Sequence, residues 1–580
     1  MSKRNINVNP QPKKQVDELS HESLSDKANL IYLSAILVIA LLVLWRVTNN
    51  GFTDWDDNLY VVDSPLIRQL NWNSFKTYFT TLTSNLYTPL VTLSYAIDYK
   101  FFGMSAAGFH STNLLLHVIN ICLVYVLTFQ IFKRSFIAAA TALLFSIHPL
   151  NVEAVAWISS RKDLLFTLFY LSGIILYLKY KTSQKIIQLI LVFVLFVLAV
   201  LSKPIAFTFP VVLLLIDYLT NKTISKRELL EKIPFLFISV LVALLGVYLV
   251  REFQVFASAP SGYTFFDKVC LAGFSLAFYL YNGIIPADIS NYHEYPFKEA
   301  LALDAKYIMA PVVCLLIVFI VIKNIRTNFK LIAGLLMFLI IIGPTLRVIP
   351  TGYPVTADRY FYLASIGFFW TIILALERAS AYSFALRYIV ITVSGILLIS
   401  YGVVSFRRVS DWKDSEKLWN SVLKNNPSHE IANDHLGKLY DNAGDKDRAL
   451  IHFQRVLVRN KDNYDVLNSA GNILAAKNET KTAIQYFDLA IATGKADHLP
   501  YYNRGLVYSS QKQFKKAIQD FDNAIGKKPD FAEAFNNRAI AEVQSGDTLK
   551  AYHDFSEAVR LKPSDKMMQD NLTRIKSYIH

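Results

Sequence analysis

Apolar runs separated by short polar segments fill the chain up to residue 405, and the pattern changes beyond it. A membrane-spanning helix needs about 20 mainly apolar residues. Runs near this length occur at about 28–48, 109–132, 135–148, 162–180, 186–201, 205–219, 233–250, 265–285, 306–322, 331–346, 360–377 and 387–405. The pattern therefore predicts an all-α, polytopic membrane domain over residues 28–405.

Basic loops set the expected topology. Lys and Arg concentrate in cytoplasmic loops, and here they gather at 133–134, 179–185, 222–232 and 323–330. This places the polar tail 1–27 in the cytoplasm and the loop 49–108 outside. If all twelve runs cross the membrane, the basic loop 323–330 lies outside the cytoplasm. With about eleven spans, every basic loop lies in the cytoplasm, as expected. The segment 265–285, which polar residues interrupt, is the candidate for a re-entrant or interfacial helix.

The N-terminal tail is too long and too acidic for the charged start of a signal peptide. We therefore expect the first apolar run to be a retained signal anchor. With eleven spans, the C-terminal region lies on the same outer side as the loop 49–108.

A repeat of 34 residues covers the C-terminal region. Its recurring positions are Gly437, Gly471, Gly505 and Ala539, then Ala449, Ala483, Ala517 and Ala551, then Phe453, Phe487, Phe521 and Phe555. Small residues let two antiparallel helices approach, while Phe fills the space between hairpins. This is the tetratricopeptide (TPR) pattern, which stacks into an α-solenoid.

The repeats divide the C-terminal region into units. We place a linker and half-repeat at 406–429, four repeats at 430–463, 464–497, 498–531 and 532–565, and a capping helix at 566–580. A concave groove of this kind binds an extended peptide or another protein. The alternative is a scaffold that only holds oligomers together.

Composition agrees with a membrane protein: 53% of residues are hydrophobic and 18% are charged. The net charge of +14 fits basic loops facing anionic lipid, so we expect no nucleic-acid partner. The three cysteines have no Cys or His neighbours at zinc spacing, so a disulfide or a cysteine-based metal site is not expected.

Polar and ionisable residues gather on the predicted outer side of the membrane domain. Ionisable groups at membrane depth are costly and are usually paired or functional. The candidates are Asp54, Asp56, Asp57, His110, Asn113, His148, Glu153, Arg161, Asp163, Lys203, Arg347, Asp358 and Arg359. Each taken alone could be a loop charge, and it is their convergence that predicts a site.

Four stretches of these residues resemble a known family. They are 52–60, with Asp56 and Asp57; 109–117, with His110 and Asn113; 148–164; and 358–367. The first resembles membrane glycosyltransferases of the C-type (GT-C) fold. Together with the repeats, all four resemble the protein O-mannosyltransferase-like proteins that combine transmembrane segments with TPRs.

The resemblance implies transfer of a mannose-like sugar from a polyprenyl-phosphate donor to Ser or Thr of extracytoplasmic proteins. Asp56 matches the general base and Asp57 the adjacent acidic residue. The cations available to bind the donor phosphate are Arg161, Lys203, Arg347 and Arg359, and we expect His148 and Glu153 to orient the donor or line the site. Relatives often carry an acidic residue after the matching lysine, where this chain has Pro204.

The chemistry of an inverting transfer suits these residue types. A carboxylate takes the proton of the attacking hydroxyl, and cations stabilise the departing phosphate, for which Arg has a matching two-pronged geometry. No cofactor is firmly predicted, and Mg²⁺ or Mn²⁺ on the aspartates is the disfavoured alternative, since oxygen ligands without fixed spacing are a weak signature.

Other functions stay open at this point. The acceptor could be a lipid or surface glycan, or the protein could be a non-catalytic membrane TPR scaffold. A transporter would place paired ionisable residues near mid-membrane, whereas these cluster at span ends. The predicted location is a bacterial inner membrane, with the site and repeats facing the periplasm, and the endoplasmic reticulum is the alternative.

Overall fold

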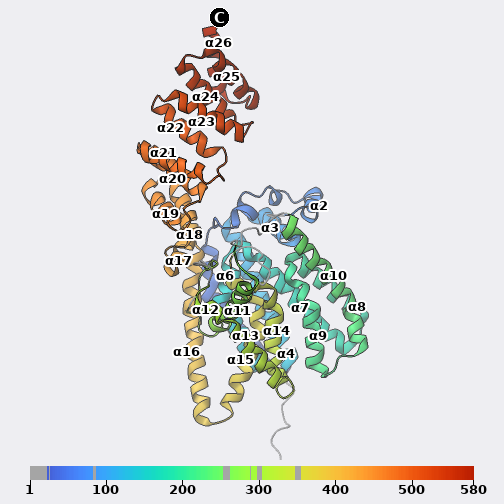
Figure 1. Cartoon of the computed structure of the whole chain (residues 1–580). Helices are drawn as coiled ribbons and strands as arrows, with labels where there is room; N and C mark the ends of the chain where they lie inside the picture. Colours follow the sequence, from blue (N-terminus) through green and yellow to red (C-terminus); the bar gives the residue numbers. More distant parts are fainter. Residues whose placement is uncertain are drawn as a thin grey trace, which may run out of the picture. The chain divides into compact units, whose positions relative to one another are not determined.

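A computed structural model describes residues 23–24, 26–82, 87–252, 262–287, 289–296, 303–346 and 354–579. The structure is 81% helical, and the described residues form no strand. It divides into two compact units, Met1–Leu418 and Trp419–His580, and the boundary falls inside the predicted linker and half-repeat. The all-α prediction is confirmed (Figure 1).

The first unit contains the membrane helices. Its elements are α1 (Lys27–Leu44), α2 (Trp72–Thr80), α3 (Pro89–Phe102), α4 (Ala106–Phe132), α5 (Ser135–Ile147), α6 (Val152–Ala156), α7 (Arg161–Ser183), α8 (Ile186–Ser202), α9 (Phe209–Asn221), α10 (Lys226–Glu252), α11 (Phe265–Asn282), α12 (Ala305–Ile308), α13 (Pro311–Asn324), α14 (Phe329–Ile342), α15 (Phe361–Ser380) and α16 (Phe384–Val409). The helix α17 (Ser415–Asn425) crosses the boundary between the units.

Eight helices of the described chain are long and apolar enough to cross a membrane, or nine if the bent pair α5–α6 is one span. Two shorter apolar helices, α8 and Phe329–Thr345, join them. These segments coincide with the eleven predicted spans. The helix α11, our candidate for an interfacial segment, is outside this set.

Pro149 ends α5 and bends the chain by 57° into the short helix α6. Proline has no N–H and clashes with the preceding helical turn. The bend turns the stretch 148–160 into a series of short helical turns, and these expose backbone carbonyls that the side chains of the candidate site use.

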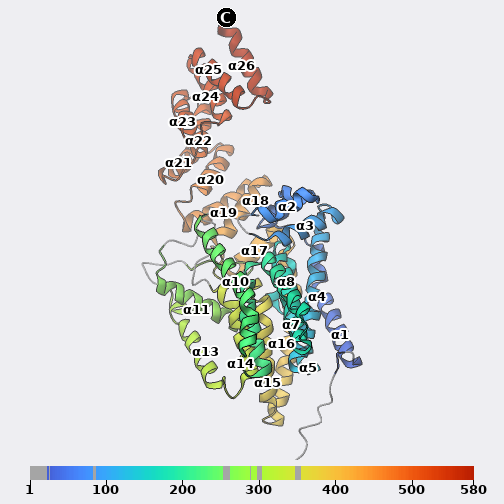
Figure 2. The same ribbon diagram turned by 90° about the vertical axis from the view of Figure 1, so that its right-hand side faces the viewer.

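The helices α14 and α15 run side by side in both views (Figures 1 and 2). A Cβ added at Gly367 would lie 2.5 Å from the Gly334 carbonyl oxygen, so only glycine allows this close approach. This packing positions the N-terminal part of α15. Asp358 and Arg359 lie in the short turn directly before this helix.

The second unit is the repeat array. After α17 its elements are α18 (Glu430–Asn442), α19 (Lys446–Arg459), α20 (Tyr464–Ala476), α21 (Thr480–Ala492), α22 (Leu499–Ser510), α23 (Phe514–Lys527), α24 (Ala532–Ser545), α25 (Thr548–Leu561) and α26 (Lys566–Ile579). They follow one another as helical hairpins (Figure 1).

Glycine and phenylalanine meet inside each of the first three hairpins, whereas the sequence pattern predicted the phenylalanine between hairpins. A Cβ at Gly437 would come within 2.5 Å of the Phe453 ring, and one at Gly471 within 2.6 Å of the Phe487 ring. In the last hairpin Ala539 packs with Phe555, and Leu572 of α26 packs against the same cluster. The helix α26 therefore covers the end of the array.

Candidate functional site

Asp57 is a buried anchor of the acidic loop. Its Oδ1 accepts hydrogen bonds from the Ser159 backbone N–H (3.0 Å) and hydroxyl (2.5 Å). Its Oδ2 accepts from the Thr53 backbone N–H (2.9 Å) and hydroxyl (3.0 Å). Burial raises the pKa of Asp57 to about 6, while these four donors favour its ionised form. Asp57 thus ties the loop to the stretch 148–164.

Asp56, one residue earlier, has a different environment. Its side chain is half-buried and makes no hydrogen bond or ion pair within the described residues. Burial raises the pKa of the neighbouring Tyr60, with the charge of Asp56 adding to the rise and that of Arg359 opposing it. Asp56 is therefore the carboxylate of the pair whose side chain has no hydrogen-bond partner in the described structure.

A small hollow at the ends of α7 and α8 brings together three predicted site residues. Asp163, Lys203 and Arg359 line it, and Lys203 pairs with Asp163. Most other lining side chains are apolar: Phe166, Ile205, Ile341 and Leu363. Cations beside an apolar wall suit an anionic group on a hydrophobic tail.

Arg359 is held in this hollow with spare hydrogen-bonding capacity. Its Nη1 pairs with Glu153, and its backbone N–H donates to the Glu153 Oε2 at 3.1 Å. Its Nε is buried and donates to no partner in the described structure. A buried, unused guanidinium donor is costly, so this N–H is available to a bound anion.

Aromatic rings surround the same guanidinium. Its Cζ lies 5.0 Å from the Trp157 ring centroid and 5.7 Å from that of Trp55. Trp55 and Trp157 stack at 4.6 Å, and Trp412 stacks on Trp157 at 5.5 Å. These cation–π contacts fix Arg359 beside the acidic loop that carries Trp55.

Lys162 connects the acidic loop with the hollow, and the sequence reading missed it. Its ammonium lies 5.3 Å from the Tyr60 ring centroid and 5.5 Å from that of Trp157. It interacts electrostatically with Asp56, Arg359, Asp163 and Lys203. The sequence signal that could have identified it is its position between Arg161 and Asp163, two residues already counted as candidates.

The structure argues against a phosphate-binding role for Arg161, which is fully buried and committed within the protein. It pairs with Asp98 at 2.5 Å, donates to Asn113 Oδ1 at 2.8 Å and donates to the Phe109 carbonyl at 2.7 Å. The amide of Asn113 in turn donates to the Trp157 carbonyl at 3.1 Å. Arg161 and Asn113 are therefore structural. Sequence reading missed Asp98, whose only signal was a lone carboxylate in an apolar helix.

Other candidates also serve the framework. His148 Nε2 contacts the Gly283 carbonyl at 3.2 Å, and its Nδ1 accepts from the Leu150 N–H at 3.2 Å. His110 Nε2 contacts the Gly51 carbonyl at 3.2 Å. These buried histidines join loops to helices and do not line the hollow.

Asp358 pairs with Arg408 at 2.7 Å, and Arg408 also donates to the Pro149 carbonyl at 3.0 Å. The sequence reading did not single out Arg408. The backbone N–H of Asp54 donates to the Ser415 hydroxyl at 2.9 Å. Arg347 lies outside the described residues. Among the residues that the structure describes, no group of three or more His, Cys, Asp or Glu side chains could hold a metal ion.

Comparisons with known families match both units. Residues 87–250 match the family described as dolichyl-phosphate-mannose-protein mannosyltransferase. Residues 435–498 and 499–531 match tetratricopeptide-repeat families. The first match includes the candidates from His110 to Lys203, while the acidic loop and Arg359 fall outside it.

Curated relatives match large parts of this chain. Protein O-mannosyl-transferase F38B6.6 of Caenorhabditis elegans is 26% identical over 378 residues, which is 62% of this chain and 52% of the relative. Protein O-mannosyl-transferase TMTC3 of Homo sapiens is 23% identical over 441 residues, covering 70% and 48%. The chain thus spans about half the length of these relatives. Among solved structures, the crystal structure of MamA is similar to part of this chain, with 25% sequence identity and a TM-score of 0.25. The match covers 27% of this chain and 92% of the MamA chain.

The apolar helices, the region that matches the mannosyltransferase family and the repeats make the chain similar to one class of protein, the membrane glycosyltransferases that carry TPRs. More narrowly, the chain is similar to proteins named protein O-mannosyl-transferase. The resemblance read from the sequence is confirmed at this level.

Proposed function

We propose that the protein transfers a mannose-like sugar from a polyprenyl-phosphate donor to Ser or Thr hydroxyls of extracytoplasmic proteins. The observation that carries the proposal is the contrast within the acidic loop. The Asp57 carboxylate accepts four hydrogen bonds, whereas the Asp56 carboxylate accepts none within the described residues and interacts electrostatically with Lys162. Lys162 in turn interacts with the cations of the hollow.

In this mechanism Asp56 accepts the proton of the acceptor hydroxyl as its oxygen attacks the anomeric carbon. The bond from that carbon to the phosphate oxygen breaks, and the polyprenyl phosphate leaves with the bonding electrons, so the configuration inverts. Lys203 and the free Nε of Arg359 stabilise the negative charge that grows on the phosphate. In this proposal the first part of the prenyl chain lies beside the apolar side chains that line the hollow.

The names of the relatives support the sugar and the acceptor class, since each is called a protein O-mannosyl-transferase. In our proposal the repeats bind the acceptor polypeptide or a partner protein. The acidic loop and the repeats lie outside the cytoplasm in our proposal, an orientation that the distribution of basic loops supports, and a bacterial inner membrane is favoured.

The test is comparative glycoproteomics of extracytoplasmic proteins from cells with and without this chain. Cells lacking it are complemented with the wild-type protein, with Asp56→Asn or with Asp63→Asn. Asp63 is an exposed carboxylate of the same loop and serves as the matched control. We expect hexose on Ser or Thr with the wild type and Asp63→Asn, and its loss with Asp56→Asn at equal membrane abundance.

Two outcomes would redirect the proposal. Glycosylation that persists with Asp56→Asn rejects the assigned base. Normal protein glycosylation together with a changed surface glycan moves the acceptor from protein to glycan or lipid.

A further inference from the structure

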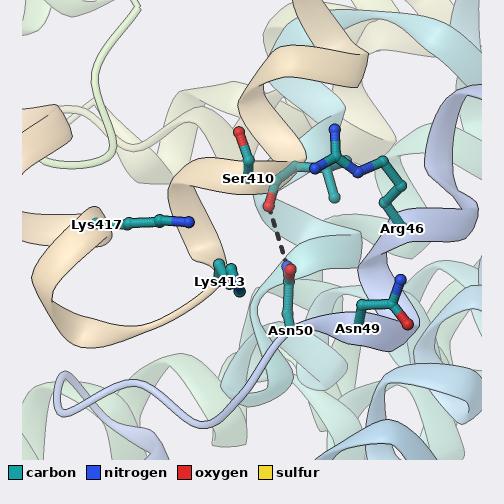
Figure 3. Close-up of a pocket in the computed structure, with 7 residues that line it drawn as sticks. Arg46, Asn49, Asn50, Ser410, Lys413 and Lys417 are labelled. Carbon is teal, nitrogen blue, oxygen red and sulfur yellow. Dashed lines mark hydrogen bonds between the residues drawn. The ribbon is translucent and has the colours of Figure 1, made fainter.

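A second pocket lies where the first and last apolar spans, α1 and α16, reach the same end of the membrane unit. It is lined by Arg46, Asn49, Asn50, Val409, Ser410, Lys413 and Lys417 and has a volume of about 170 Å³ (Figure 3). Water occupies about 30 Å³ per molecule in the liquid, so the pocket has room for several waters or one small anion.

The lining is positively charged and contains no carboxylate. Within the described residues, the side chains of Arg46, Lys413 and Lys417 form no ion pair. Figure 3 shows Arg46 and Asn49 facing Ser410 and Lys413 from opposite sides of the pocket. Three cations held together without a counter-charge repel one another, and a bound anion removes that repulsion.

The walls are fixed by contacts between the two spans. The buried Asn50 amide donates to the Val409 carbonyl at 3.0 Å, and the Gly51 N–H donates to the Lys413 carbonyl at 2.8 Å. The Arg46 guanidinium lies 5.0 Å from the Phe406 ring centroid. These contacts hold together the chain segments that carry the cations, while the side chains of Lys413 and Lys417 are exposed.

Exposed apolar side chains next to the pocket indicate where the anion comes from. Leu42 and Trp45 on the first span are 65% and 52% exposed, and Val403 on the last is 46% exposed. Such side chains face lipid in a membrane helix, and Trp is typical of the membrane–water interface. A cationic pocket at this depth lies at the level of lipid head groups.

We infer that this pocket binds the phosphate group of a membrane phospholipid and so clamps the first membrane span to the last. The Lys and Arg side chains supply the charge, and the Asn49 amide and Ser410 hydroxyl supply neutral hydrogen bonds. The inference is independent of the proposed function, since none of these residues lines the hollow of Lys203 and Arg359. The same chemistry would accept free phosphate, and the experiment distinguishes the two sources.

The test uses the purified full chain in a neutral detergent. Short-chain phosphatidylglycerol or inorganic phosphate is titrated while Tm is followed. Three proteins are compared: wild type, Lys413→Gln/Lys417→Gln, and the control Lys76→Gln/Lys100→Gln, which loses the same charge from exposed lysines elsewhere in the first unit.

We expect phosphatidylglycerol to raise the Tm of the wild type and the control, and to act with at least about tenfold weaker apparent affinity on Lys413→Gln/Lys417→Gln. Inorganic phosphate should have little effect. A response to inorganic phosphate that the pocket variant loses supports the same site with free phosphate as its ligand. Equal responses of all three proteins, or no response of the wild type to either anion, overturns the inference.

Discussion

The two units use the same ion-pair chemistry in opposite settings. In the membrane unit, Arg161 with Asp98 and Lys232 with Asp217 have side chains that are 0–6% exposed. In the repeat unit, Lys562 pairs with Glu533, and their side chains are 48% and 41% exposed. Water can replace a partner of this exposed pair but not of the buried pairs. The comparison teaches that the contribution of an ion pair to stability depends on how deeply its partners are buried.

The sharpest test of this contrast compares Arg161→Gln with Lys562→Gln. The first leaves the Asp98 carboxylate buried without its cation and should cost about 3–5 kcal/mol. The second removes an exposed pair and should cost about 1 kcal/mol or less. Hydrogen exchange of α4 and α7, against α24 and α25, measures each effect in its own unit. Equal losses of protection would break the comparison.

Lys203→Gln tests whether the charges of the hollow serve catalysis rather than stability. Lys203 is half-buried and pairs with Asp163, so its removal should perturb folding less than Arg161→Gln. We expect kcat/KM for the lipid-linked donor to fall by about 10²–10³, with a smaller loss of helix protection than Arg161→Gln causes. Lys100→Gln is the control, and an equal fall in that variant would reject the assignment.

Packing in the repeats can be tested with two glycines. A Cβ at Gly471 would approach the Phe487 ring to 2.6 Å, whereas one at Gly526 meets nothing within 4 Å. Gly471→Ala should therefore destabilise its hairpin by about 1–3 kcal/mol. Gly526→Ala, inside α23, should be neutral or stabilise by up to about 1 kcal/mol. Chemical unfolding followed by hydrogen exchange of α20 to α23 measures both, and destabilisation by Gly526→Ala alone would contradict the packing.

The smallest effect is a pH dependence of the repeats. Burial raises the pKa of Glu542 to about 7, Asp554 adds to the rise, and Arg538 opposes it. The folded repeats therefore hold this proton more tightly than the unfolded chain does, so their stability should fall as pH rises from about 4.5 to 7. Glu542→Gln should lessen this fall. Hydrogen exchange of α24 at pH 5 and pH 8, corrected for intrinsic rates, checks it, and an unchanged pH profile would contradict it.

The elements of both units could be predicted from sequence because they follow local rules. Apolar length located the spans, and the 34-residue period located the helical hairpins. The partners of buried charges could not be predicted. Arg161 and Asp98 are 63 residues apart in the sequence, and Asp358 and Arg408 are 50 apart. No sequence periodicity relates the two members of either pair.

Asp56 and Asp57 illustrate the limit most clearly. They are adjacent and chemically identical in sequence, so their roles could be taken only from the resemblance. Burial separates them, because Thr53 and Ser159 converge on Asp57 alone. Ser159 lies in the series of short helical turns that begins at Pro149. Its distance from Asp57 is set by the folded structure and cannot be read from the sequence.

The most direct test of the central claim is sugar transfer by the purified full chain, with radiolabelled polyprenyl-phosphate mannose and a Ser/Thr-containing acceptor polypeptide. Wild type and Asp63→Asn should transfer label at equal rates, and Asp56→Asn should be slower by about 10²–10⁴. Equal rates for all three proteins would contradict the account.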